Sequence, residues 1–255
     1  MLQLPIEKKR SPFRLDGSAL KLIAVFSMLI DHSAVALIET GVLHSLDETV
    51  LFSLLNTEFG RRWYTIDLVF RMIGRIAFPL FCFLLTEGFL HTHDRKKYGA
   101  GLLLFALLSE VPFDLLVTGR LYDPGYQNVY WTLAAGLAVL WGMDRTQGSL
   151  SLQLLILALG AGAAELLRTD YGGIGVLLIA LFYLLRKKPF WQTLCCGALT
   201  AWESWSVLGT AALSLIPIRL YSGKRGKLRL KYFFYWFYPI HILLLVGLRF
   251  LLFRV

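Results

Sequence analysis

Charged and polar residues capable of acid–base chemistry stand inside the most apolar stretches of this sequence. Asp31 and His32 are adjacent in the first stretch. Asp67, Arg71 and Arg75 follow at intervals of four in the second stretch, and residues four apart share one face of an α-helix. Near pH 7 a neutral imidazole can take up a proton, and an arginine can stabilise an oxyanion. The same charges would also suit a path for ions or solutes across a membrane.

Further polar residues lie at the ends of later apolar stretches. Glu110 and Asp114 are four apart, with Pro112 bending the backbone between them, and Asn128 opens the stretch that follows. We expect these side chains to lie at the depth of His32. They could take part in a reaction, or they could neutralise the buried arginines as structural ion pairs.

The orientation of the His32 ring requires a partner from another helix. Neighbours on a helix point about 100° apart, so Asp31 does not face the imidazole of His32. Asp31 is then available to pair with Arg71 or Arg75. The carboxylates that could orient His32 are Asp67, Glu110 and Asp114.

Composition indicates what kind of molecule holds these residues. The chain has 255 residues, of which 56% are hydrophobic and 17% charged, and its mean hydropathy is +0.60. A soluble domain would have about 25% charged residues, so an integral membrane protein is favoured over a soluble enzyme or a disordered chain. The 26 Lys and Arg exceed the 17 Asp and Glu. In a membrane protein this excess marks cytoplasmic loops rather than a nucleic-acid surface. The three cysteines form no disulfide or zinc pattern.

The apolar stretches predict an all-α bundle of transmembrane helices in a single domain over residues 1–255. A span needs about 20 mainly apolar residues. The loop at 39–65, which we expect outside the cytoplasm, could form a short amphipathic helix. The nine predicted spans are residues 19–38, 66–90, 98–117, 128–142, 150–167, 172–185, 190–205, 206–220 and 232–253.

Loop charges predict that the N-terminus is cytoplasmic, because positive residues gather in cytoplasmic loops. With this orientation the outer segments hold Arg61, Arg62, Arg120, Arg168 and Arg254. The inner segments hold Lys8, Lys9, Arg10, Arg14, Arg95, Lys96, Lys97, Arg145, Arg186, Lys187, Lys188, Arg219, Lys224, Arg225, Lys227, Arg229 and Lys231. His32 then lies on the order of 9 Å below the outer end of the first span, at the level of the other buried charges.

A second group of reactive side chains is predicted at the inner end of the bundle, where Glu87, His91 and His93 precede the basic run at 95–97. The His-x-His pair has no obvious third ligand, so we expect no metal. The basic run fits the excess of positive residues that marks a cytoplasmic loop, and it could also bind a phosphorylated ligand.

Several ordered blocks of residues resemble the TraX family, over most of the chain. These blocks are residues 15–24 (LDGSALKLIA), 27–32 (SMLIDH), 71–81 (RMIGRIAFPLF), 87–92 (EGFLHT), 108–114 (LSEVPFD), 127–129 (QNV) and 234–241 (FYWFYPIH). The family is named for an inner-membrane protein that acetylates the N-terminus of conjugative pilin. Its layout is similar to that of membrane acyltransferases that modify cell-surface sugars.

The resemblance implies an acetyltransferase of the bacterial inner membrane that uses acetyl-CoA as the acyl donor. His32 matches the catalytic histidine in the first helix of the wider group, and Arg71, Arg75 or Asn128 would stabilise the oxyanion. The acceptor could be a peptide, a sugar, a lipid or a small amine. Donor-binding residues are expected to be Glu87, His91, Arg95, Lys96, Lys97 and His241, with the basic segment at 224–231. A transporter or channel is the alternative function.

Overall fold

The computed structural model describes residues 14–227 and 231–254, and these residues form helices joined by short loops. Among them are two isolated backbone bridges, Leu15–Tyr221 and Gln127–Thr169. The predicted all-α fold is therefore confirmed. The helices are α1 (Gly17–Ser33), the π-helical η1 (Ala34–Val42), α2 (Glu48–Leu55), α3 (Glu58–Gly74), α4 (Ala77–His91), α5 (Arg95–Val117), α6 (Val129–Arg145), α7 (Leu150–Leu166), α8 (Gly172–Leu184), α9 (Pro189–Glu203), the 3₁₀ turns η2 (Trp205–Val207) and η3 (Thr210–Ser214), α10 (Leu215–Arg219) and α11 (Lys231–Phe253).

Polar residues in front of the helices determine where many of them begin. A side-chain oxygen at this position accepts a hydrogen bond from a backbone N–H that the first helical turn leaves unpaired. Residues that cap a helix in this way are Asp16, Asp47, Thr57, Asp94, Asn128 and Ser149.

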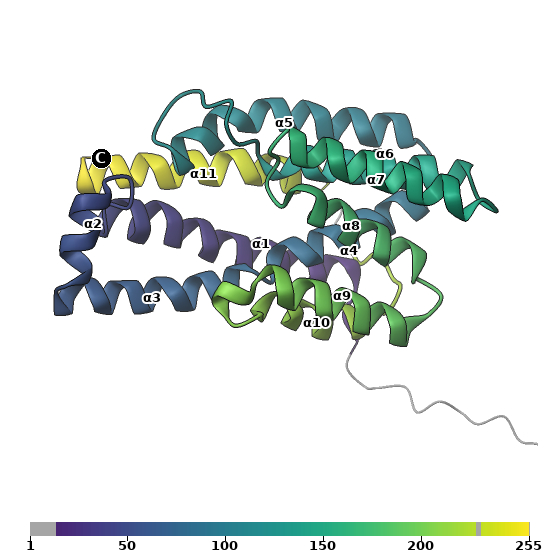
Figure 1. Cartoon of the computed structure of the whole chain (residues 1–255), viewed down its shortest axis with the longest axis horizontal. Helices are drawn as coiled ribbons and strands as arrows, with labels where there is room; N and C mark the ends of the chain where they lie inside the picture. Colours follow the sequence, from purple (N-terminus) through teal and green to yellow (C-terminus); the bar gives the residue numbers. More distant parts are fainter. Residues whose placement is uncertain (1–13, 228–230, 255) are drawn as a thin grey trace, which may run out of the picture.

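The long helices lie side by side along the long axis of the molecule, and α2 crosses it at one end (Figure 1). From α4 to α9 the chain runs back and forth through short turns. The basic segments at 95–97, 145 and 186–188 therefore come to the same end of the bundle. Lys8, Lys9, Arg10 and Arg229 lie outside the described residues. Which face of the membrane the basic end meets stays a prediction.

Four helical stretches of the described chain are long and apolar enough to cross a membrane. They are Gly17–Val42, Glu58–His91, Arg95–Val117 and Tyr232–Phe253. They correspond to the first, second, third and ninth predicted spans. The remaining helices are shorter, so the structure supports an integral membrane protein with four candidate spans, and nine crossings stay a prediction.

Two parts of the predicted topology differ from the structure. The loop expected at 39–65 is largely helical, because η1 prolongs α1, α2 follows and α3 begins at Glu58. The eighth predicted span consists of the short helices η3 and α10. Hydropathy missed the start of α3 because its first turns carry charged residues, such as Glu58, Arg61 and Arg62.

The contact between α1 and α3 depends on a glycine. A Cβ atom added to Gly74 would lie 2.1 Å from Oδ1 and 2.3 Å from Cβ of Asp31. The absence of a side chain at Gly74 thus lets the last turn of α3 approach α1 at Asp31. Just beyond it, the α3 helix ends at Arg75 before α4 begins.

We predict that Gly74→Ala destabilises the protein, because overpacking a tight contact costs about 1–3 kcal/mol. The methyl group would push Asp31 out of position. Gly162→Ala is the matched control, because nothing lies within 4 Å of a Cβ at that helical position. It should stabilise the fold by about 0.5–1 kcal/mol. Thermal unfolding in detergent would measure both changes, and equal unfolding temperatures for the two variants would contradict the tight contact.

Candidate functional site

Two buried histidines from opposite ends of the chain form a hydrogen-bonded pair. His32 lies near the end of α1 and His241 in the first half of α11, where it is 5% exposed. Nδ1 of His32 lies 2.7 Å from Nε2 of His241, and the two rings are nearly parallel. His241, predicted among the donor-binding residues, therefore lies beside His32.

The partners of this pair indicate which nitrogen of His32 is basic. Nδ1 of His241 lies 2.5 Å from the carbonyl oxygen of Phe237. A carbonyl oxygen only accepts, so this nitrogen carries the proton. In the neutral ring Nε2 of His241 then accepts, and Nδ1 of His32 must donate to it. A neutral His32 therefore carries its lone pair on Nε2, the atom that can take a proton from a substrate.

Asp31 forms an ion pair with an arginine instead of orienting His32. Its Oδ2 atom lies 2.7 Å from Nη1 of Arg71. Nε of the same arginine lies 3.2 Å from Oε1 of Glu39, a residue that the sequence placed in a loop. The predicted pairing of Asp31 with Arg71 or Arg75 is confirmed. Asp67 is buried one turn before Arg71, and it interacts with Arg71 and Glu39 rather than with His32.

Arg75 connects this cluster to the end of α9. Its Nη1 atom lies 3.7 Å from Oε1 of Glu203, a long ion pair. Asp31 and Asp170 are also close enough to Arg75 for electrostatic interaction. Nε of Arg75 is buried, and in the described part of the chain it has no hydrogen-bond partner. One hydrogen-bond donor of Arg75 is therefore left unused within the described chain.

Glu110 and Asn128 bind each other, away from His32. Nδ2 of Asn128 donates to Oε1 of Glu110 at 2.6 Å and to the carbonyl oxygen of Ala106 at 2.7 Å. Both amide hydrogens of Asn128 are therefore committed, and the expected role in an oxyanion hole does not fit this geometry. Trp131 also donates to Glu110, at 2.5 Å. These contacts join α5 to the start of α6.

Asp114 anchors a loop. It accepts a hydrogen bond from the backbone N–H of Asp123 at 2.9 Å. The expectation that Asp67, Glu110 or Asp114 orients His32 is therefore wrong for this structure, because His241 occupies the position beside Nδ1.

The basic end of the bundle, where Arg95, Lys96 and Lys97 lie, presents fewer free cations than the sequence suggested. Nη1 of Arg95 lies 2.6 Å from Oδ2 of Asp144, and its guanidinium stacks over the Phe89 ring. Lys96 and Lys97 are exposed. Arg95 is thus partly neutralised, while the two lysines remain available for a phosphorylated ligand.

The two polar residues predicted beside these cations, Glu87 and His91, interact with other protein groups. The side chain of Glu87 forms a hydrogen bond with Tyr221. Nδ1 of His91 donates to the carbonyl oxygen of Glu87 on its own helix at 2.8 Å, and His91 is exposed. The described residues contain no group of three potential metal ligands.

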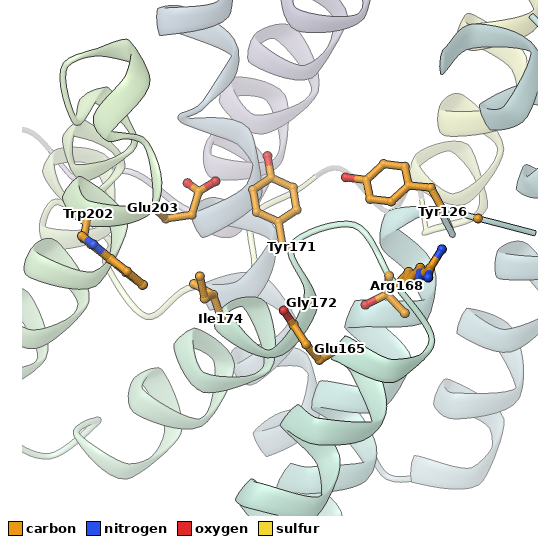
Figure 2. A pocket seen from close by; sticks show the side chains of 10 residues that line it. Tyr126, Glu165, Arg168, Tyr171, Gly172, Ile174, Trp202 and Glu203 are labelled. Atoms are coloured by element: carbon orange, nitrogen blue, oxygen red, sulfur yellow. The ribbon is translucent and has the colours of Figure 1, made fainter. Parts of the chain in front are cut away.

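A cleft of about 680 Å³ opens beside Arg75, between the α5–α6 loop, the α7–α8 loop and the end of α9. Figure 2 shows Tyr126, Tyr171 and Glu203 around its upper part and Glu165 below. The ring of Tyr171 stacks on Phe78, with centroids 3.5 Å apart. This cleft was not predicted from the sequence.

The α7–α8 loop holds an unusual backbone conformation at the cleft. Arg168 and Tyr171 have positive φ angles of 51° and 64°, values that non-glycine residues rarely adopt. Backbone hydrogen bonds to Gln127 hold the loop in place. The hydroxyl of Tyr126 donates to Oδ1 of Asp170 at 2.7 Å, and burial raises the pKa of this carboxyl group to about 6. Such strain persists only where the surroundings enforce it, and it concentrates at functional sites.

Comparison with known proteins supports one family. The family model described as TraX protein matches residues 16–249. A curated relative from Dichelobacter nodosus, the probable fimbrial assembly protein FimC of serogroup H1, is 29% identical over 254 residues, which cover 90% of this chain and 94% of the relative. No solved structure matches. The family model covers most of the chain, including both histidines and the arginine cluster. The chain therefore belongs to the TraX family.

Proposed function

We propose that this protein is a membrane-embedded acyltransferase, which moves an acetyl or other acyl group from acyl-CoA to an amine or hydroxyl acceptor. The observation that carries the proposal is the His32–His241 pair. It supplies a neutral, oriented imidazole close to a buried ion pair, and within the described residues Nε2 of His32 has no hydrogen-bond partner. A general base placed in this way contributes about 10²–10⁴-fold to a rate.

The reaction requires one proton to pass through His32. The acceptor nitrogen or oxygen forms a bond to the thioester carbonyl carbon, and Nε2 of His32 takes the acceptor's proton. The carbon–sulfur bond then breaks, sulfur leaves with the electron pair, and the imidazolium returns the proton to it. The products are the acylated acceptor and the free thiol of CoA. Arg71 and Arg75 are the candidates to stabilise the intermediate oxyanion.

A two-step route through an acylated His32 would give the same products. In that route Nε2 attacks the thioester and the thiol leaves, and the acceptor then displaces the acyl group from the ring. His241 serves both routes by fixing the His32 tautomer.

The acceptor that we favour is an amine or hydroxyl on a subunit of a surface fibre. The support is the relative from Dichelobacter nodosus, which is described as a probable fimbrial assembly protein, together with membership of the TraX family. The donor would approach from the basic end, where Lys96 and Lys97 are exposed. The proposal therefore assigns the reaction to the bacterial inner membrane.

We predict that His32→Ala lowers acyl transfer by at least about 10²-fold, because the general base is lost. His241→Ala should also lower transfer, by a smaller factor, since His32 loses its orienting partner. His44→Asn is the control, because His44 lies in the turn before α2 and asparagine tolerates its positive φ of 52°. The assay follows thiol release from acetyl-CoA by purified protein, with mass spectrometry of a peptide acceptor.

Full activity of folded His32→Ala protein would refute the acyltransferase proposal. Solute uptake by proteoliposomes without thiol release would favour the transporter alternative. Mass spectrometry of cell-envelope extracts from expressing and deleted cells would show the natural acceptor as a difference of one acyl group.

We also predict that the double variant Lys96→Ala/Lys97→Ala raises the KM for acetyl-CoA several-fold and leaves kcat unchanged, because these exposed cations can bind phosphate groups. Lys187→Ala/Lys188→Ala tests another basic pair at the same end of the bundle. Steady-state kinetics at low and moderate salt would separate the two pairs. An equal KM for both double variants would show that Lys96 and Lys97 have no special part in donor binding.

A further inference from the structure

A second hollow, of about 810 Å³, lies between α9 and the η3–α10 segment, and we call it the α9–α10 groove. Leu194, Gly197 and Ala198 line it from α9, and Leu215 and Ile216 line it from α10. These two helices lie at the edge of the bundle (Figure 1). Leu194 is 51% and Ile216 59% exposed, so the groove opens outward. In an integral membrane protein, an open apolar groove at the edge of the bundle faces lipid.

One end of the α9–α10 groove carries a cation. Arg219 is the charged member of the lining, and its Nη1 atom donates to the carbonyl oxygen of Pro189, the first residue of α9, at 3.2 Å. Within the described residues Arg219 forms no ion pair with a carboxylate. A guanidinium group has five N–H donors and binds phosphate oxygens through pairs of them. Arg219 is therefore equipped to bind an incoming phosphate group.

The residues around the start of α9 indicate the depth of this charged end. Lys187 and Lys188 are exposed in the turn before α9. Phe190 and Trp191, in the first turn of the helix, are 68% and 52% exposed. Lysines extend from the ends of membrane helices toward the headgroups, and aromatic rings concentrate at the same level. The charged end of the groove therefore lies where lipid headgroups would be.

The length of the groove matches one leaflet of a bilayer. The part of α9 that lines it runs from Thr193 to Ala201, which is about 12 Å at a rise of about 1.5 Å per residue. Half of a hydrocarbon core about 30 Å thick is about 15 Å. A lipid whose phosphate binds Arg219 can thus lay an acyl chain along the whole apolar part of the groove.

The charges at this end favour a lipid with a net negative headgroup. Arg219 adjoins the turn that holds Lys187 and Lys188, and the lining of the groove includes no carboxylate. A zwitterionic headgroup would bring a cation of its own among these three cations. An anionic headgroup brings only the charge that they attract, and basic pockets between membrane helices bind such headgroups.

We infer that the α9–α10 groove binds one anionic phospholipid, with an acyl chain against Ala198 and Ile216 and the phosphate on Arg219. The inference goes beyond the proposed acyl transfer and does not rest on it, because neither acyl donor nor acceptor takes part in this binding.

The test is native mass spectrometry of the full chain released from detergent micelles, with phosphatidylglycerol and phosphatidylcholine of the same acyl chains as probes. The wild type should retain one phosphatidylglycerol in preference to phosphatidylcholine. Arg219→Gln should lower the affinity for phosphatidylglycerol about five-fold, the contribution of one basic residue near a membrane surface. Arg219→Lys keeps the charge and should keep most of the preference.

A second variant tests the apolar part of the groove. Ala198→Phe places a ring where the acyl chain would lie and should weaken the binding of both lipids. Two control variants lie outside the groove and should bind like the wild type. Arg145→Gln removes an exposed cation at the basic end, and Ala163→Phe adds a ring at an exposed position of α7.

Two results would overturn the lipid site. The first is phosphatidylglycerol binding that stays unchanged in both Arg219→Gln and Ala198→Phe. The second is a dimer of the wild type that Ala198→Phe dissociates, because the groove would then hold a second copy of the chain. The same spectra report lipid binding and oligomeric state, so each result is read directly. Loss of acyl transfer in His32→Ala would have no bearing on either.

Discussion

The hydrogen bond between His32 and His241 is the interaction on which the site depends. It joins a helix near the start of the chain to the last helix, and the carbonyl oxygen of Phe237 fixes the direction in which its proton points. A histidine pair can serve this purpose in a low-dielectric interior because neither ring needs to be charged at rest. A carboxylate in the place of His241 would have brought a further buried charge, with its desolvation cost.

The buried charges around this histidine pair can be accommodated because they form ion pairs within the bundle. An isolated charge at the middle of a bilayer costs about 2.5–3.5 kcal/mol on insertion scales. Arg71 meets this constraint by binding Asp31 and Glu39 together, and the close approach of α3 at Gly74 brings Asp31 within reach. Arg75 is less completely matched, since its contact with Glu203 is long and its Nε has no partner in the described chain. Arg75 thus differs from an arginine in a purely structural ion pair, because its hydrogen bonds are incomplete and its partner Glu203 lines a cleft.

The sequence predicted features that depend on one helix at a time. Spacing placed Arg71 where it can meet Asp31, and hydropathy located the segments that became the helical bundle. It could not show that α11 packs His241 against His32, because periodicity along one helix does not specify its neighbours. Asn128 illustrates the opposite error. Its polarity suggested a role in stabilising an oxyanion, whereas both of its amide hydrogens are donated to oxygen atoms of α5. The cleft was missed because it is formed by loops far apart in the chain, and only the Asp170–Tyr171–Gly172 run within an apolar region hinted at it.

Chain direction gives the two ends of helices α4 to α9 different side chains. Successive helices from α4 to α9 alternate in direction, so the turns after α4, α6 and α8 meet at one end and carry the basic residues. The loops after α5, α7 and α9 turn the other way, and they supply Tyr126 and Tyr171 and adjoin Glu203. Exposed lysines therefore stand at the first set of connections, whereas Glu165 and Glu203 border the cleft at the second. The alternation of the chain separates these basic turns from the acidic side chains of the cleft.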